Sequence, residues 1–199
     1  LAREWVPGAM LAGAQEQMAV TLLLTFALGN ADCHSKNLAF LYTGLDDVRV
    51  APVYDMLTLL AYEQFADNPP GMYIDGRKSW APDQALWRFL QQHLGIEPQR
   101  QRALVDLVCQ SVADVVPELL QHTRHTRGFA DVGRAMLWQW NAGMKRLTNR
   151  CTVAVPDFLD AAVDAGLERP VAPLKYAAKR LGESALLAPR SKRRVRPAS

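Results

Sequence analysis

A dense polar segment between two apolar runs is the feature that most constrains how this chain folds. Residues 30–37 read NADCHSKN, and six of these eight side chains, Ala31 and the weakly polar Cys33 excepted, readily form hydrogen bonds or ionise. The run at 18–28 is apolar apart from two threonines, and the apolar string LAFLY follows at 38–42. Burying this much polarity is unfavourable unless partners or bound ions satisfy it. We therefore expect the polar segment to form part of a site.

The patterns around this segment predict a helix, a β-hairpin and then a series of helices. A two-stranded hairpin is marginal alone, so we expect it to lie against helices, in a mainly α (α+β) fold. Pro117 is expected to kink or divide its helix. The predicted helices are 12–28, one beginning within 56–62, 82–94, 98–122, 131–149, 156–165 and 173–182; the predicted strands are 38–42, 48–52 and a short one at 72–74.

The predicted hairpin brings its two outer ends together. Asn37 lies just before the first strand and Asp55 just after the second, so their side chains are expected to converge. Oxygen ligands of this kind suit a divalent cation. Phosphoryl transfer needs one carboxylate that accepts the proton of the attacking hydroxyl, and an amide and a second carboxylate that hold Mg²⁺. Asp32 and Asn37 have the Asp-x-x-x-x-Asn spacing of a kinase catalytic loop, and Asp55 has the placement of the metal-binding acid.

The string N-x-D-x-H-x-K-N at 30–37, followed by A-P-x-Y-D at 51–55, resembles the catalytic segment of HipA-type serine/threonine kinases, the toxins of bacterial toxin–antitoxin pairs. The later MYIDGRKSW and the helical remainder are also similar, so that the resemblance extends over roughly residues 10 to 150. It implies a protein-kinase-like C-terminal lobe, which we place at 1–186. Residues 187–199 lie outside the resemblance, and we expect them to form a basic, disordered tail.

The resemblance also implies a role for each residue of the polar segment that matches the family. Asp32 is expected to be the catalytic acid that positions the substrate hydroxyl. Asn37 and Asp55 are expected to bind Mg²⁺, and His34 and Lys36 to lie near the phosphates of ATP. The implied reaction phosphorylates a protein Ser or Thr, and the implied partner is an antitoxin-like DNA-binding protein. His34 occurs at its position in lipid-type kinases as well, so this motif alone does not define the substrate class.

The sequence departs from a complete kinase upstream of Asp32. No G-x-G-x-x-G or V-A-I-K-like string lies among the 31 preceding residues. We therefore expect the N-terminal lobe to be absent, and kinase activity of the chain alone to be weak or lacking. The missing initiator Met indicates a piece of a longer chain or a non-standard start. A non-catalytic module that docks an antitoxin-like partner or nucleic acid is the alternative function.

Two other interpretations of the polar segment remain open. Asp32 and Asn37 could each cap a turn, and Asp55 could cap a following helix. Alternatively, Asp32, His34 and Asp55 could ligate a transition metal in a hydrolase, although no second histidine lies nearby. The combination of all three side chains with an intervening hairpin favours the kinase interpretation.

The positive charge of the chain is concentrated at its C-terminus. Residues 189–199 hold five of the 23 basic residues and none of the 20 acidic ones, so the rest of the chain carries 18 basic and 20 acidic residues. Such a tail could bind nucleic acid or an acidic protein. The residues concerned are Arg190, Lys192, Arg193, Arg194 and Arg196.

Cysteine usage and hydropathy favour a cytoplasmic protein. Cys33, Cys109 and Cys151 have no CxxC spacing, which is typical of reduced thiols. The N-terminal residues lack the pattern of a secretory signal. The longest apolar stretch, 18–28, is shorter than the roughly 20 residues needed to cross a bilayer, so we expect a buried helix and no membrane span.

Overall fold

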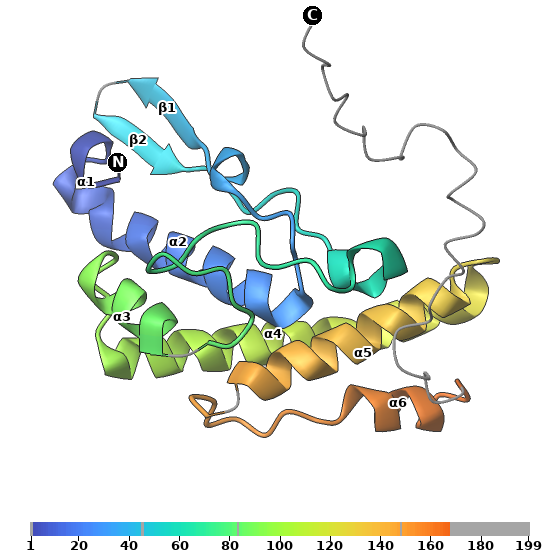
Figure 1. The fold of residues 1–199 in the computed structure, drawn as a ribbon. Helices are drawn as coiled ribbons and strands as arrows, with labels where there is room; N and C mark the ends of the chain where they lie inside the picture. Colours follow the sequence, from blue (N-terminus) through green and yellow to red (C-terminus); the bar gives the residue numbers. More distant parts are fainter. Residues whose placement is uncertain (1, 45, 83, 148, 168–199) are drawn as a thin grey trace, which may run out of the picture.

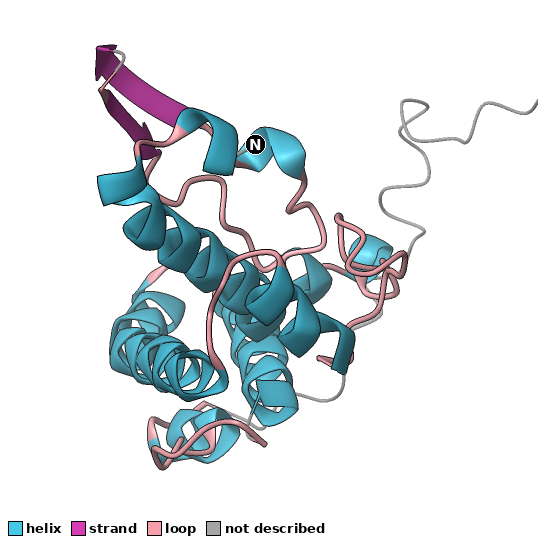
Figure 2. Cartoon of the chain, turned by 90° about the vertical axis from the view of Figure 1, so that its left-hand side faces the viewer, coloured by secondary structure: helices cyan, strands magenta, loops and turns pink. Residues whose placement is uncertain are grey.

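The computed structural model describes residues 2–44, 46–82, 84–147 and 149–167 (Figure 1). These residues form a mainly helical body with one two-stranded antiparallel sheet, which confirms the expected α+β class (Figure 2). The predicted helix at 173–182 and the basic tail lie outside the described residues. The elements are α1 (Ala2–Trp5), α2 (Gly8–Leu28), η1 (Ser35–Asn37), β1 (Phe40–Gly44), β2 (Asp47–Val50), η2 (Leu59–Ala61), η3 (Glu63–Phe65), α3 (Gln84–Gln92), α4 (Pro98–His125), α5 (Ala130–Leu147) and α6 (Phe158–Asp164), where η denotes a short 3₁₀ helix.

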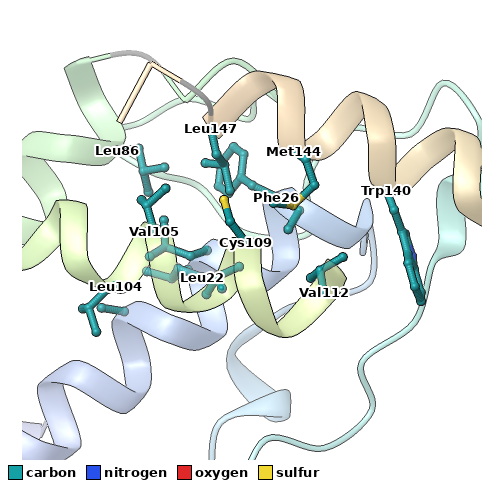
Figure 3. Close-up of a cluster of buried hydrophobic side chains, with 14 of the residues drawn as sticks. Leu22, Phe26, Leu86, Leu104, Val105, Cys109, Val112, Trp140, Met144 and Leu147 are labelled. Carbon is teal, nitrogen blue, oxygen red and sulfur yellow. The ribbon is translucent and has the colours of Figure 1, made fainter. Parts of the chain in front are cut away.

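The apolar helix α2 forms the centre of the core. Its side chains Leu22 and Phe26 pack against α4 and α5 (Figure 3). By length and composition α2 could cross a membrane, but here most residues of its second half, from Ala19 to Ala27, are buried in the core. Gly143 allows α5 to cross α2 closely, because a Cβ at this position would overlap the carbonyl oxygen of Ala27. The apolar run therefore serves as a buried core helix, as predicted.

Helix α4 runs without interruption through Pro117. A division of the helix at Pro117 is therefore wrong, although proline removes one backbone donor from its interior. The other expected outcome, a kink, stays a prediction. Val112, Val116 and Leu120 are buried on the same helix, so packing on both sides of the proline holds the segment in place. At the other end of α4, the buried Gln101 side chain donates to two backbone carbonyls near α3, Trp87 at 3.0 Å and Ile96 at 2.8 Å.

The hairpin lies beside the N-terminal half of α2, with its strands about two residues from the predicted positions. Val50 at the end of β2 packs in a small apolar cluster with Val6 and Ala14. Gln17 of α2 donates to the carbonyl of Ala51 at 2.5 Å. The register pairs are Phe40 with Val50, Leu41 with Arg49, Tyr42 with Val48 and, after an irregularity, Gly44 with Asp47.

The segment after the hairpin corrects two predictions. Residues 56–58 are not helical, and only the short turns η2 and η3 follow, where a helix beginning within 56–62 was expected. Side chains of α5 determine this path, since Trp140 donates to Thr58 Oγ1 at 2.7 Å and Gln139 donates to the Leu60 carbonyl at 2.9 Å. The strand expected at 72–74 is reduced to one isolated bridge between Ile74 and Arg77.

Candidate functional site

The polar segment begins where the core helix α2 ends. Gly29 adopts a left-handed conformation with φ of 70°, and the backbone N–H groups of Gly29 and Asn30 both donate to the carbonyl of Thr25, at 3.1 and 3.0 Å. Glycine ends a helix in this way without the steric cost of a side chain. A turn between Asn30 and Cys33 then leads into η1. The segment is therefore anchored directly on the buried C-terminal end of α2.

Asn37 contacts Asp55 across the base of the hairpin. The buried Asn37 side chain donates from Nδ2 to Asp55 Oδ2 at 2.7 Å, although the two residues are 18 positions apart. Its Oδ1 accepts the backbone N–H of His34 at 3.1 Å. Both ends of the amide thus form hydrogen bonds, and in this arrangement its nitrogen faces Asp55.

Asp55 has an unusual backbone conformation. Its φ is 54°, in the left-handed region that residues other than glycine rarely adopt. Such a conformation costs on the order of 1–3 kcal/mol and persists when the surroundings enforce it. The bond from Asn37 holds its side chain, and the preceding Tyr54 donates its hydroxyl to the carbonyl of Lys36 at 2.6 Å. The Asp55 side chain remains exposed next to the polar segment.

Asn30 links Asp32 and Asp55, a connection that the sequence did not predict. Its side chain is 1% exposed. Asn30 Oδ1 accepts the backbone N–H of Asp32 at 3.1 Å, and Nδ2 donates to the backbone carbonyl of Asp55 at 3.3 Å. The one available signal was the position of Asn30 as the first residue of the recognised string.

The other candidate residues are less constrained. Asp32 and Lys36 are exposed, and neither side chain makes a hydrogen bond or ion pair with another described residue. His34 is half-buried, and its Nδ1 atom is enclosed without a hydrogen-bond partner within the described ranges. The structure therefore brings Asn37 and Asp55 into contact and attaches the Asp32 backbone to them through Asn30. It does not join the side chains of His34 or Lys36 to this group.

Gly71 packs against the backbone of the polar segment, and Leu60 binds the backbone of Gly29 just before it. The sequence did not identify either residue as part of the site. Gly71 packs so closely that a Cβ there would overlap the carbonyl oxygen of Cys33. The backbone N–H of Leu60 donates to the carbonyl of Gly29 at 3.2 Å. Burial raises the pKa of the Cys33 thiol, so this cysteine stays protonated at neutral pH and is a poor nucleophile.

A transition-metal site receives no support from the geometry. Within the part of the chain that the structure describes, no group of three or more His, Cys, Asp or Glu side chains is arranged to hold a metal ion. The alternative set of Asp32, His34 and Asp55 therefore does not form such a cluster.

Comparison with known families identifies one that this chain matches. A family model described as the HipA-like C-terminal domain matches residues 2–116, more than half of the chain. The chain belongs to the HipA-like C-terminal domain family. This confirms the predicted resemblance, with a match that begins earlier than expected and ends within α4 rather than near residue 150. The matched part of this HipA-like domain includes the polar segment, the hairpin and Asp55. A search of curated proteins and a search of solved structures each found no match.

Proposed function

We propose that this HipA-like domain is the C-terminal catalytic lobe of a serine/threonine kinase, which transfers the γ-phosphoryl group of ATP to a protein Ser or Thr hydroxyl. The observation that carries the proposal is the 2.7 Å contact between Asn37 and Asp55, next to the segment that bears Asp32. A catalytic acid, a metal-binding amide and a metal-binding acid are the groups that phosphoryl transfer requires of this lobe.

Asp32 suits the role of the acid that receives the substrate hydroxyl. Its side chain is exposed and hydrogen-bonds no other described residue, so both carboxylate oxygens can face a substrate. Its backbone is held by Asn30, which limits the positions that the carboxylate can take. Asp32 would orient the hydroxyl and accept its proton as the bond to phosphorus forms.

Asn37 and Asp55 form a donor set that fits Mg²⁺. This ion is usually bound by one or two carboxylates together with substrate phosphates and water. Asp55 offers an exposed carboxylate, and Asn37 adds an amide, although its nitrogen faces Asp55 in the structure. Asp55 is therefore the primary ligand, and Asn37 would bind through its oxygen after a turn of its amide. Bound Mg²⁺ would neutralise charge on the phosphates of ATP.

Lys36 and His34 would face the phosphates. Lys36 is exposed and makes no ion pair with a described residue, so its ammonium group can contact an anionic ligand. Its carbonyl accepts from Tyr54, which ties this part of the segment to the residue that precedes Asp55. His34 contributes a half-buried ring with an unsatisfied Nδ1.

Family membership suggests a cytoplasmic toxin–antitoxin kinase whose partner is an antitoxin-like DNA-binding protein. The sequence has no glycine-rich phosphate loop or strand lysine upstream of Asp32. We therefore expect this chain alone to transfer phosphate weakly, and fully only when a lobe with these elements is supplied.

Nucleotide binding tests the proposal directly. Titration calorimetry should detect ATP binding that requires Mg²⁺ and weakens at least about tenfold in Asp55→Asn, as expected for loss of a metal ligand. Asp75→Asn is the matched control, because Asp75 is also exposed and also has a positive φ, of 51°. Equal ATP affinity of the wild type in Mg²⁺ and in a chelator would contradict the proposal.

A non-catalytic docking module is the second candidate. Leu41 and Tyr42 of β1 are 55% and 77% exposed. Neighbouring strand residues point to opposite faces, so both faces of the hairpin present apolar surface. This candidate predicts binding of an antitoxin-like partner that Tyr42→Glu abolishes and that Mg²⁺-ATP does not change.

The basic tail lies outside the described residues, and its contact with nucleic acid stays a prediction. Binding through the tail should weaken steeply with salt and disappear when residues 189–199 are deleted. DNA binding that is insensitive to salt would remove this role.

A further inference from the structure

The structure assigns Asn30 as a positioning residue that holds the backbones of Asp32 and Asp55 at a fixed separation. The consequence for metal binding rests on the proposed function, whereas the positioning itself rests on contacts alone. Nothing in the assignment requires Asn30 to touch substrate or metal.

Both the oxygen and the nitrogen of the Asn30 side-chain amide form hydrogen bonds. Its oxygen accepts the Asp32 N–H at 3.1 Å, and its nitrogen donates to the Asp55 carbonyl at 3.3 Å. The nitrogen also lies 3.3 Å from Met56 Sδ. A single planar group therefore spans two segments that are more than twenty residues apart in sequence. Because the side chain is 1% exposed, water cannot readily replace either bond.

Asn30 can position these segments because its own backbone is held. Its N–H donates to the Thr25 carbonyl of α2 at 3.0 Å, and Thr25 lies beside the core residue Phe26. The amide thus connects the buried end of α2 to the backbones of both acids. Groups fixed on rigid elements keep a productive site geometry better than groups held only by loops.

Asn30 helps to maintain the strained backbone conformation of Asp55. Asn37 binds the side chain of Asp55, but Asn30 binds its backbone carbonyl. Without the Asn30 bond, the left-handed backbone at φ of 54° loses a contact that enforces it. We expect Asp55 to relax away from Asn37 and from the Asp32 segment.

Metal affinity is the first test, with Mn²⁺ as a paramagnetic probe for Mg²⁺. In the full chain, Mn²⁺ should broaden the NMR signals of Asn37 and Asp55, and Asp55→Asn should abolish this effect. Asn30→Ala should raise the apparent Kd at least about tenfold, the effect typical of residues that orient metal ligands. Absence of broadening in the wild type would contradict the proposed function.

Asn141→Ala is the matched control, because Asn141 is another buried amide, 6% exposed, that accepts a backbone N–H from Phe158. It should destabilise the chain without changing Mn²⁺ affinity. Equal Kd values for Asn30→Ala and wild type would overturn the assignment, and so would an equal loss of affinity in Asn141→Ala.

Amide hydrogen exchange tests the positioning without any metal. Asn30→Ala, or the near-isosteric Asn30→Leu if the first variant unfolds, should accelerate exchange of the Asp32 N–H by at least about tenfold, since a buried acceptor is lost. Asn141→Ala should change this rate only as far as overall stability changes. An unaltered Asp32 rate in both Asn30 variants would overturn the assignment whatever the metal result.

Discussion

At the scale of single residues, the site depends on one backbone conformation that its sequence does not favour. Asp55 has a φ of 54°, and polar side chains from the preceding segment hold it there. Residues in sparsely populated conformations concentrate at functional sites, where surrounding contacts enforce them. The strain can be measured separately from the loss of the hydrogen bond to Asn37.

A comparison of two substitutions of Asp55 separates the backbone strain from the loss of the hydrogen bond to Asn37. Asp55→Gly and Asp55→Ala both lose the bond from Asn37, but only alanine must place a Cβ in the left-handed region. We expect Asp55→Ala to unfold with a free energy about 1 kcal/mol lower than Asp55→Gly, measured by urea denaturation. The same pair at Asp32, which has no positive φ, should not show this order. Equal stability of the two Asp55 variants would mean that the conformation is not strained.

At the scale of the elements, close crossing of α5 over α2 brings the two helices together beneath the site. A Cβ on Gly143 would overlap backbone carbonyl oxygens of Phe26 and Ala27. The same pair of helices is linked to the site, since α2 ends at the polar segment and α5 donates to Thr58 and Leu60. Separation of the helices would therefore disturb the segment that contains Asp55.

Gly143→Ala should lower the free energy of unfolding by about 1–3 kcal/mol, the range for overpacking a core, as measured by urea denaturation. Gly13→Ala in α2 provides the control, because a Cβ there would meet no atom within 4 Å. Alanine at this helical position should raise the free energy of unfolding by about 0.5–1 kcal/mol. A neutral Gly143→Ala would contradict the close crossing.

At the scale of the whole molecule, Asp106 fastens the segment after α5 to helix α4. Its carboxylate accepts backbone N–H groups from Thr152 at 2.6 Å and Val153 at 3.2 Å, and it also accepts the Thr152 hydroxyl. Burial opposes ionisation of Asp106, but these hydrogen bonds prevail and lower its pKa. These contacts of Asp106 hold the segment that leads into α6, whose Phe158 is fully buried in the core.

The lowered pKa of Asp106 predicts a loss of stability in acid. An Asp with a depressed folded-state pKa contributes stability above its unfolded value, near 3.9, and this is lost as the pH falls through the folded value. Asp106→Asn should cost about 1–2 kcal/mol at pH 7 and progressively less as the pH falls below about 4. Urea denaturation over this pH range measures the effect, with the exposed Asp67→Asn as control. A constant cost at all pH values would show that charge on Asp106 does not contribute.

Much of the fold could be predicted because local patterns decide it. The apolar run of α2, the Pro and Gly boundaries around α3 and the turn of the hairpin each act within a few residues. The path of residues 56–62 could not be predicted, because Trp140 and Gln139 bind it from α5, about 80 positions away. The continuity of α4 through Pro117 depended in the same way on packing against other helices.

For the site, the chain order of Asn37, a hairpin and Asp55 was enough to predict that the two side chains converge, because a hairpin necessarily returns to its starting point. Local sequence could not reveal the Asn30 bridge, the left-handed backbone of Asp55 or the close approach of Gly71 to Cys33. Each of these depends on the distance between segments that meet only after the helices have packed. Tertiary structure alone sets such distances, since hydrogen bonds and steric overlap change over a few tenths of an ångström.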